Sequence, residues 1–411
     1  MVQKILIANR GEIALRIIRA CRELGIKTVA IYSKADELSL HTRFADEAIC
    51  VGPNESAKSY LNIPSILSAA ELTDADSIHP GYGFLSENSR FSSICKENNI
   101  KFIGPDAETI NLMGNKSLAK DTMKKVGVPT IPGSDGNVGT YEEAKYICSN
   151  MGYPVIIKAT SGGGGKGMRL VNEESELEQA FEMAKVESEA AFSDSNVYIE
   201  KYLNNPRHIE IQIMCDNFGN VIPLGERECS LQRRHQKVLE ESPSVIVDDS
   251  LRKKLYDSTI KGCKAVNYLG AGTIEYLVDD DLNYYFMEMN TRIQVEHPVT
   301  EMVLGLDLIK NQILCHNEIP LPDWMKDIKL RGHAIECRIN AEDPSKSFMP
   351  SPGLITSFHM PGGNGIRVDT HAYSGYYVPQ YYDSMIAKLI VSAPTRQEAI
   401  SRMLGALNEC V

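Results

Sequence analysis

Residues 272–300 read GTIEYLVDDDLNYYFMEMNTRIQVEHPVT, and this stretch decides the fold. Residues 273–278 and those from Tyr284 onward alternate between apolar and polar side chains, and the mostly polar residues 279–283 separate them. This pattern predicts a β-hairpin with a short loop. Because successive side chains of a strand point to opposite faces, one face of the second strand is expected to carry Glu288, Asn290, Arg292, Gln294 and Glu296.

Two acids of this hairpin indicate a cation site. A turn centred between Asp281 and Leu282 would set Glu275 opposite Glu288. Facing carboxylates repel by up to roughly 1 kcal/mol unless positive charge lies between them. A divalent cation with Asn290 as a further oxygen ligand would relieve this, and Mg²⁺ bound in this way usually keeps phosphate oxygens in its shell. The alternative is a solvated polar face, but five functional side chains in unbroken alternation favour the site.

Composition bounds the class of protein. The chain has 411 residues, enough for two or three domains, and its 43% hydrophobic and 24% charged content is ordinary for globular proteins. Its net charge of −11 argues against nucleic acid as the main partner, because phosphate backbones are bound by clustered Lys and Arg.

The ten cysteines include no CxxC pair, which argues against a zinc site or a disulfide framework and indicates a reducing compartment. No charged leader with a long apolar core opens the chain, and no run of about 18 apolar residues occurs. These features predict a soluble cytoplasmic protein.

The N-terminal part alternates strand and helix patterns, which predicts a parallel sheet covered on both sides. A glycine loop would be expected after the first strand of a nucleotide fold, but the turn around Gly11 lacks the GxGxxG spacing, so a plain turn is favoured. HPGYGF at residues 79–84 could line a pocket or merely turn the chain. The predicted strands are residues 4–9, 28–32, 77–79 and 102–104, and the predicted helices are 12–24 and 63–71.

A Gly/Pro-rich stretch, residues 127–139, predicts a hinge into a second domain. A strand carrying Lys158 follows, then the loop TSGGGGKG at residues 160–167 and a strand at residues 168–171. The loop is not Walker A, because it joins two strands and its spacing differs. Its free N–H groups, with Lys158 and Lys166, favour a phosphate cover over an unliganded hairpin tip.

The central part carries a basic cluster within an acidic protein. Residues 226–237 read ERECSLQRRHQK, and Gln232, His235 and Lys237 fit an anion pocket better than a solvated loop. The residues at 208, 210 and 212 form the polar face of a predicted strand. Other predicted elements are a strand at residues 196–202, helices at 176–190, 249–266, 301–314 and 396–407, a boundary at 320–322, and a strand-rich C-terminal part with Arg338 in the strand 333–339.

Six segments together resemble biotin carboxylase, the ATP-grasp component of acetyl-CoA carboxylase. They are ANRGEIALRI, HPGYGFLSEN, SGGGGKGM, EKYL, ERECSLQRRHQKVLEE and MEMNTRIQVEHPVTE. The resemblance covers essentially the whole chain, and RIQVEHPVTE is highly specific. The chain departs from the family at Ser161, where many members have a further glycine, and members continue beyond the position of Val411.

The resemblance implies an α/β and α+β architecture, the ATP-grasp fold. It implies a Rossmann-like parallel-sheet domain over residues 1–113, an ATP-grasp domain over residues 114–330 with a small lid at about 131–203, and a β-rich biotin carboxylase subdomain over residues 331–411, which is expected to be truncated.

The resemblance also assigns residues to ligands. It implies a metal site at Glu275, Glu288 and Asn290. It implies a bicarbonate site at Lys237, Arg292, Gln294, Val295 (by its backbone) and Glu296, with Arg338 and Tyr82 on the biotin side. It implies ATP contacts from Lys116, Lys158, Gly163, Gly164, Gly165, Met168, Glu200, Lys201, Tyr202, Leu203, His208, Gln232, His235, Glu275 and Leu277.

The implied activity is that of a ligase which carboxylates biotin with ATP, Mg²⁺ or Mn²⁺ and bicarbonate, by way of carboxyphosphate. Glu296 would deprotonate bicarbonate and Arg338 would stabilise the enolate oxygen of biotin. The implied partners are biotin carboxyl carrier protein, carboxyltransferase subunits and a second copy in a homodimer, in fatty acid synthesis. The carboxylase part of a pyruvate or propionyl-CoA carboxylase is the alternative. The starting Met and the absence of a biotinyl-lysine segment favour a free-standing subunit.

Overall fold

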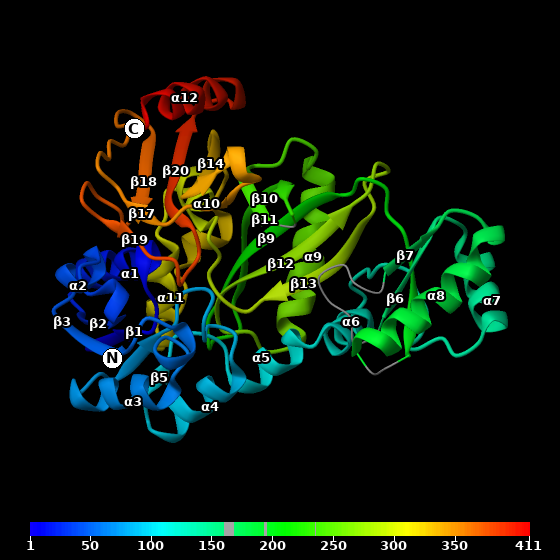
Figure 1. Cartoon of the computed structure of the whole chain (residues 1–411), viewed down its shortest axis with the longest axis horizontal. Coiled ribbons are helices and arrows are strands. Elements are labelled where there is room, and N and C mark those ends of the chain that lie inside the picture. Colours follow the sequence, from blue (N-terminus) through cyan, green and yellow to red (C-terminus); the bar gives the residue numbers. More distant parts are fainter. Residues whose placement is uncertain (160–167, 193–194, 235) are drawn as a thin grey trace. The chain divides into compact units, whose positions relative to one another are not determined.

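A computed structural model describes residues 1–159, 168–192, 195–234 and 236–411 (Figure 1). The chain divides into two compact units. The first comprises Met1–Val128, His208–Tyr276 and Glu288–Val411, and the second comprises Pro129–Arg207 and Leu277–Met287. The division at Val128 falls inside the Gly/Pro-rich stretch where the sequence predicts a hinge.

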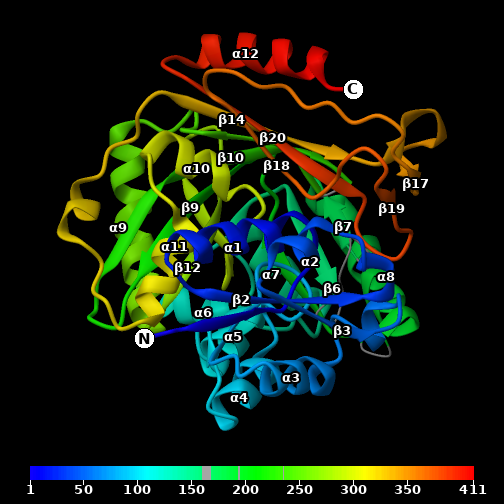
Figure 2. The same ribbon diagram turned by 90° about the vertical axis from the view of Figure 1, so that its left-hand side faces the viewer.

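The N-terminal part of the first unit is a parallel sheet of order β3-β2-β1-β4-β5, as predicted. Alternate residues of β1 enter two different cores: Ile5 and Ile7 face helix α1, and Leu6 faces α3. Figure 2 accordingly shows α1 and α3 on opposite sides of this sheet. The elements are β1 (Lys4–Ile7), α1 (Gly11–Glu23), β2 (Lys27–Ser33), α2 (Leu40–Phe44), β3 (Glu47–Gly52), α3 (Ile63–Leu72), β4 (Ser77–His79), α4 (Ser89–Glu97), β5 (Lys101–Phe102), α5 (Ala107–Gly114) and α6 (Lys116–Lys125).

An eight-stranded sheet has the order β13-β12-β9-β10-β11-β14-β20-β18. The strands of the C-terminal part therefore extend the sheet that contains the hairpin strand β12. Its members are β9 (Arg207–Cys215), β10 (Val221–Arg233), β11 (Gln236–Ser242), β12 (Gly270–Val278), β13 (Tyr284–Asn290), β14 (His333–Asn340), β18 (Ile366–Thr370) and β20 (Met385–Ala393). Residues 226–233 of the basic segment lie in β10, and residues 236–237 lie in β11.

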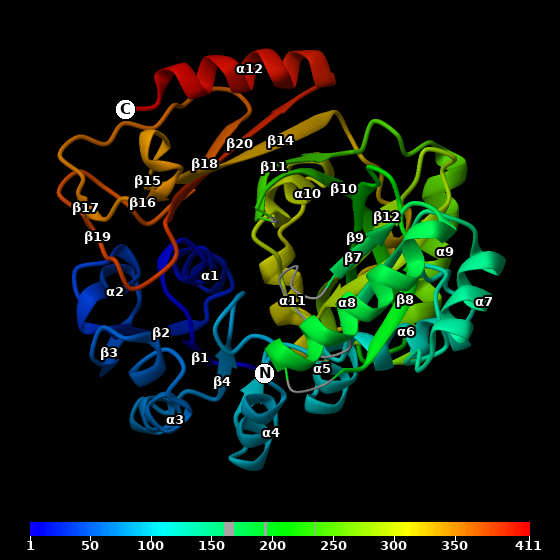
Figure 3. The ribbon, with the colours of Figure 1, turned by 45° about the vertical axis from the view of Figure 1, so that its right-hand side comes forward.

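Helices cover both faces of the C-terminal strands (Figure 3). Leu389 and Val391 of β20 pack with Met403 of α12 (Arg396–Glu409), whereas Ile390 packs with Val299 of α10 (His297–Leu304) on the other face. Lys388 has the same parity as Ile390, so it lies on the α10 face.

The single helix predicted at residues 301–314 is wrong. Helix α10 ends at Leu304 because Gly305 adopts a left-handed conformation (φ 66°), and α11 (Leu308–His316) restarts with Asp307 accepting a hydrogen bond from the Lys310 N–H. Helix α9 is Asp249–Ala265, and two short ribbons pair β15 (Glu342–Asp343) with β16 (Met349–Pro350) and β17 (Gly353–Leu354) with β19 (Tyr377–Val378).

The second unit contains an antiparallel sheet of order β7-β6-β8. Lys158 pairs with Met168 on one side and Tyr198 on the other. Helices α7 and α8 contribute Ala144 and Phe181 to its core. The elements are α7 (Tyr141–Met151), β6 (Val155–Ala159), β7 (Met168–Val171), α8 (Glu174–Phe192) and β8 (Val197–Lys201).

Among the helices of the described ranges, none is long and apolar enough for a membrane span. All ten cysteines are free thiols.

Candidate active site

The predicted hairpin is present. β12 and β13 flank residues 279–283, where Asp279 Oδ1 accepts hydrogen bonds from the N–H groups of Asp281 (3.0 Å) and Asn283 (2.8 Å). The expectation that the second strand continues to Glu296 is wrong. β13 ends at Asn290, and α10 begins at His297 with Pro298 in its first turn, where a missing N–H costs nothing.

Glu275 is a buried carboxylate with donors on both oxygens. Its Oε1 accepts hydrogen bonds from Lys237 Nζ (3.0 Å), Asn290 Nδ2 (2.8 Å) and Gln294 Nε2 (3.0 Å). Its Oε2 lies 2.7 Å from His208 Nε2. Burial favours the neutral acid, but Lys237 and His208 outweigh it and hold the pKa of Glu275 well below its usual range.

Glu288 differs from Glu275 in its surroundings. Its side chain is 36% exposed, and Lys116 Nζ lies 3.8 Å from its Oε2. Partial burial and the negative charge of Glu275 raise the pKa of Glu288. The two hairpin acids therefore repel each other, and added positive charge beside them would be stabilised.

Lys237 of β11 is the meeting point of the site. Its Nζ donates to Glu210 Oε2 (2.6 Å), Glu275 Oε1 (3.0 Å), Gln294 Oε1 (3.2 Å) and Glu296 Oε1 (2.6 Å). We call Lys237, Glu210, Glu275, Gln294 and Glu296 the Lys237 centre. An ammonium has only three N–H groups, so the four acceptors around Lys237 must share them. An arriving anion can therefore replace one of these acceptors.

Other buried cations compensate the three carboxylates of the Lys237 centre. Arg227 is fully buried and contacts Glu210, Gln212, Thr273 and Thr300. It holds the Glu210 carboxylate in place, and four of its five N–H groups already donate to these partners. Arg227 is therefore part of the support of the centre, although it belongs to the predicted basic segment.

Glu296 lies between two cations at the start of α10. Its Oε1 contacts Lys237, and its Oε2 accepts from an Nη of Arg338 (3.1 Å). Arg338 also donates through Nε to Glu240 Oε1 (2.7 Å). Burial opposes ionisation, yet Lys237 and Arg338 hold the pKa of Glu296 well below its usual range. The carboxylate is ionised and becomes a stronger base once a ligand draws either cation away.

Arg292 depends on a residue that the sequence analysis did not single out. Its Nε donates to Glu87 Oε2 (2.8 Å), and an Nη donates to Asn290 Oδ1 (3.0 Å). Glu87 Oε1 also accepts from the Thr291 N–H (3.1 Å). Glu87 belongs to the quoted HPGYGFLSEN segment. Glu210 was likewise visible only as a member of the polar face at positions 208, 210 and 212.

Of the remaining predicted residues, His208 Nδ1 lies 3.0 Å from Gln232 Nε2, next to the Lys237 centre. Tyr82 does not join that centre directly, because its hydroxyl donates to Glu12. The Val295 carbonyl accepts from Lys388 Nζ (2.8 Å).

The other predicted ATP contacts lie in the second unit. There Lys158 Nζ pairs with Glu200 Oε2 (2.6 Å), and Lys201 Nζ donates to the carbonyls of Gly152 and Tyr153. Met168, Tyr202, Leu203 and Leu277 belong to the same unit. Gly163, Gly164, Gly165 and His235, with Ser161 and Lys166, lie outside the described residues.

The comparisons with known proteins agree over the whole chain. The family model for the biotin carboxylase N-terminal domain matches residues 1–110, that for the carbamoyl-phosphate synthase L chain ATP-binding domain matches 115–323, and that for the biotin carboxylase C-terminal domain matches 336–411. Biotin carboxylase 1 of Bacillus subtilis (strain 168) is 57% identical, over 100% of this chain and 92% of that protein. The chain belongs to the biotin carboxylase family.

Solved structures of the biotin carboxylase family share this fold. A biotin carboxylase from Campylobacter jejuni, in a β,γ-ATP complex, is 54% identical with a TM-score of 0.91 over 100% of this chain and 92% of its own. The biotin carboxylase domain dimer of Hydrogenobacter thermophilus 2-oxoglutarate carboxylase, in complex with MgADP, ADP and bicarbonate, is 49% identical with a TM-score of 0.90, over 100% and 90%. The predicted fold class is confirmed.

Proposed function

We propose that this chain catalyses the ATP-dependent carboxylation of biotin with bicarbonate, by way of carboxyphosphate. The observation that supports this most is the Glu296 carboxylate, buried between Lys237 and Arg338. Lys237 would bind the negative charge of bicarbonate and carboxyphosphate, Glu296 would take a proton from bicarbonate, and Arg338 would face the biotin oxygen where negative charge develops. These are three adjacent side chains with three complementary roles.

Arg292 would bind bicarbonate with the two parallel N–H groups of its guanidinium, which match a planar oxyanion. Glu87 fixes the Nε side of that guanidinium. Gln294 and the Val295 backbone would complete the bicarbonate contacts. Because Gln294 bonds to Lys237 and Glu275, its amide orientation is already set before an anion arrives.

Glu275, Glu288 and Asn290 would hold Mg²⁺ or Mn²⁺. They fit such an ion, because the raised pKa of Glu288 reflects negative charge that a cation would offset, and because carboxylate and amide oxygens are suitable ligands. When bound, the ion neutralises phosphate charge during transfer. For the nucleotide we retain, as a proposal, all of the ATP contacts that the resemblance implies.

The partners are proposed on the family alone. We propose a homodimer, as named for the Hydrogenobacter relative, and a biotin carboxyl carrier protein and carboxyltransferase as partners. An acetyl-CoA carboxylase of fatty acid synthesis is the favoured assembly, and another biotin-dependent carboxylase is the alternative. The domain boundaries at residues 113 and 330, the lid at about 131–203 and a cytoplasmic location are likewise proposals.

The test is ADP formation with ATP, Mg²⁺, bicarbonate and free biotin. Glu296→Ala and Arg338→Ala should lower biotin carboxylation by roughly 10²–10³-fold while nucleotide affinity stays largely unchanged. Asp323→Ala, at an exposed ion pair with Lys326, is the control and should keep normal turnover. Normal turnover of either site variant would remove that residue from the mechanism.

Two other functions make different predictions in this assay. An ATP-grasp ligase that joins a carboxylate to an amine would not need bicarbonate, and a non-catalytic nucleotide-binding module would hydrolyse no ATP. ADP formation that depends on bicarbonate and rises with biotin excludes both.

A further inference from the structure

A second buried lysine lies behind the Lys237 centre. Lys388 stands in β20, whose sequence MIAKLIVSA is otherwise without charge, and its side chain is 0% exposed. It lies on the face that α10 covers. A charged group is stable in such a place only when it is paired and hydrogen-bonded, so its contacts identify what it holds.

Lys388 Nζ contacts three oxygen atoms. It donates to the Val295 carbonyl (2.8 Å) and lies 3.1 Å from Glu12 Oε1 and 3.9 Å from Asp369 Oδ2. Burial opposes the charged form, but the carboxylates of Glu12, Glu336 and Asp369 raise the pKa of Lys388. The side chain is therefore an ammonium with one backbone acceptor and Glu12 as its near counter-charge.

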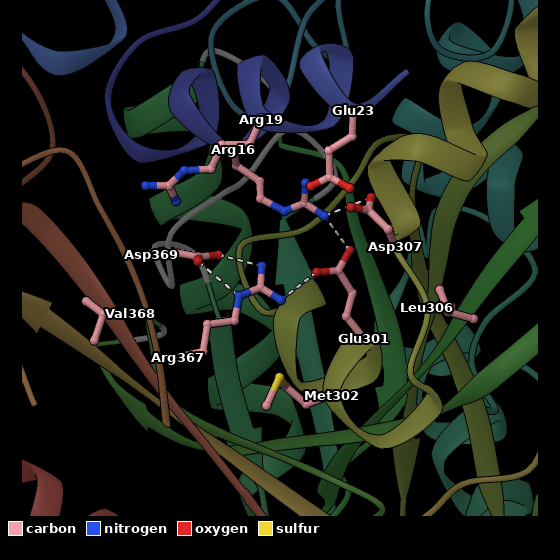
Figure 4. A pocket seen from close by; sticks show the side chains of 10 residues that line it. All are labelled: Arg16, Arg19, Glu23, Glu301, Met302, Leu306, Asp307, Arg367, Val368 and Asp369. Carbon is pink, nitrogen blue, oxygen red and sulfur yellow. Dashed lines mark hydrogen bonds and ion pairs between the residues drawn. The ribbon is translucent and has the colours of Figure 1, made fainter. Parts of the chain in front are cut away.

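Asp369 is a weaker partner because another cation engages it. Arg367 donates to both of its oxygens, at 2.9 Å and 2.7 Å, and also to Glu301 (2.7 Å). Figure 4 shows these contacts at a pocket of about 430 Å³ that Arg16, Arg19 and Glu23 also line. The Arg367–Asp369 pair leaves Glu12 and the Val295 carbonyl as the short contacts of Lys388.

Each short contact leads to a residue of the proposed site. Glu12 Oε1 also accepts a hydrogen bond from the hydroxyl of Tyr82, a residue that the family resemblance puts beside biotin. Asn9 Nδ2 donates to the carbonyls of Pro80 and Tyr82 (both 2.7 Å) and fixes the same turn. Val295 stands between Gln294 and Glu296 of the Lys237 centre. One ammonium thus contacts the backbone of the bicarbonate side and, through one carboxylate oxygen, the tyrosine of the biotin side.

We propose that Lys388 is a positioning residue for the carboxylation of biotin, which orients the Val295–Glu296 backbone directly and the Tyr82 side chain through Glu12. This inference rests on the proposed function. It adds Glu12 and Lys388 to the site as residues that act without contacting a substrate. It also explains the ANRGE segment, because Asn9 and Glu12 hold the biotin-side turn.

Lys388→Met removes the charge and nearly preserves the volume. The KM for bicarbonate should rise about tenfold, the equivalent of one hydrogen bond. The kcat/KM for free biotin should fall on the order of 100-fold, because small displacements of reacting groups are costly. The KM for ATP should stay within about twofold, since Lys388 contacts none of the proposed ATP-binding residues within the described ranges.

Glu12→Gln separates the two connections. It should lower kcat/KM for biotin and leave the KM for bicarbonate unchanged, since Lys388 still bonds to the Val295 carbonyl. Met403→Ala is the matched control: it opens a cavity on the opposite face of β20 and destabilises the fold without touching a charge. Its KM values for bicarbonate and ATP and its kcat/KM for biotin should equal those of the wild type.

The outcomes discriminate. If Lys388→Met changes all three constants by the same factor, or leaves bicarbonate and biotin unaffected, Lys388 is structural only and the inference is overturned. If Lys388→Met does not fold, Glu12→Gln with normal biotin kinetics overturns it equally. A wild-type protein that carboxylates no biotin overturns the proposed function itself, which the wild-type assay reveals before any variant is made.

Discussion

Two lysines of the same sheet show how exposure decides what a buried ammonium can do. Lys237 of β11 and Lys388 of β20 are both held by carboxylates and by polar groups of residues 294–296. Lys237 is 14% exposed and has four acceptors, whereas Lys388 is 0% exposed and has one carbonyl and one near carboxylate. An anion from solution can reach the first and replace one of its partners. Lys388 is inaccessible to solvent, so it can act only through the groups that it contacts.

The strand register connects Lys388 with Arg338, a partner of Glu296. Arg338 of β14 pairs with Lys388 of β20, and Glu336, two residues before it, pairs with Glu240 of β11. The same face of three neighbouring strands thus carries Arg338, which contacts Glu296, and Lys388, which contacts the Val295 carbonyl.

The largest effect is expected at Lys237. Lys237→Met leaves Glu210, Glu275 and Glu296 without their shared cation and removes the group proposed to bind carboxyphosphate. We expect biotin carboxylation, measured as biotin-dependent ADP formation, to fall about a thousandfold. Lys253→Met, on the exposed surface of α9, is the control. A loss of less than tenfold would mean that the more open lysine has no direct part in the reaction.

The next effect concerns stability and should be larger at the sealed lysine. Lys388→Met leaves the buried Glu12 carboxylate without its near counter-charge, so the free energy of unfolding should fall by about 3–5 kcal/mol in a urea titration. Lys237→Met should cost less, because each carboxylate that it leaves behind keeps a second basic partner: Arg227 at Glu210, His208 at Glu275 and Arg338 at Glu296. A larger loss of unfolding free energy in Lys237→Met than in Lys388→Met would contradict the supporting role of Lys388.

A smaller effect is expected at Glu87. Glu87→Gln keeps a hydrogen-bond acceptor for Arg292 but removes the ionic partner, so the KM for bicarbonate should rise about tenfold while the KM for ATP stays unchanged. Steady-state kinetics with bicarbonate varied would measure this, and Glu97→Gln on the exposed side of α4 is the matched control. An unchanged bicarbonate KM would show that the charge of Glu87 is not needed to orient Arg292.

The smallest effect is expected for Glu336→Gln, on the free energy of unfolding at acidic pH. It is fully buried, neither of its oxygens has a hydrogen-bond partner among the described residues, and burial together with Glu240 raises its pKa well above the usual range. The folded protein therefore keeps a proton that the unfolded chain releases above about pH 4.5, so this group lowers stability as the pH rises.

Glu336→Gln should accordingly change the free energy of unfolding by no more than about 1 kcal/mol at pH 5. From pH 5 to pH 8 the free energy of unfolding of the variant should rise relative to that of the wild type, by up to about 1.4 kcal/mol per pH unit. Urea titrations at several pH values would measure the difference. A constant difference would show that Glu336 is ionised, with Lys388 as its counter-ion.

The sequence made much of the Lys237 centre visible because its residues lie in polar alternating segments. The loop at residues 279–283 and the strand with Lys158 were predicted correctly from turn residues and period-two patterns. The continuation of the second strand to Glu296 was not, because residues 291–296 alternate in polarity without being strand. The alternation there reflects contacts with Lys237 and Glu275, which lie far away in the chain.

Glu12, Glu87 and Lys388 escaped prediction for a related reason. Lys388 is a single charge in an apolar strand, and local sequence does not tell an ammonium that pairs with a distant carboxylate from one that reaches solvent. Glu12 follows a turn that lacks the nucleotide-binding spacing, and its partners are about 70 and 376 residues away in the chain. Only tertiary pairing gives these residues a role.

The most direct test of the difference between the two lysines is transfer of labelled bicarbonate to biotin. We predict that the wild-type protein forms acid-labile labelled carboxybiotin, that Lys237→Met forms almost none at any bicarbonate concentration, and that Lys388→Met recovers part of its rate when bicarbonate is raised. If the wild type consumes ATP but transfers no label to biotin, this account is contradicted. It is also contradicted if the carboxylation rate of Lys237→Met recovers at high bicarbonate.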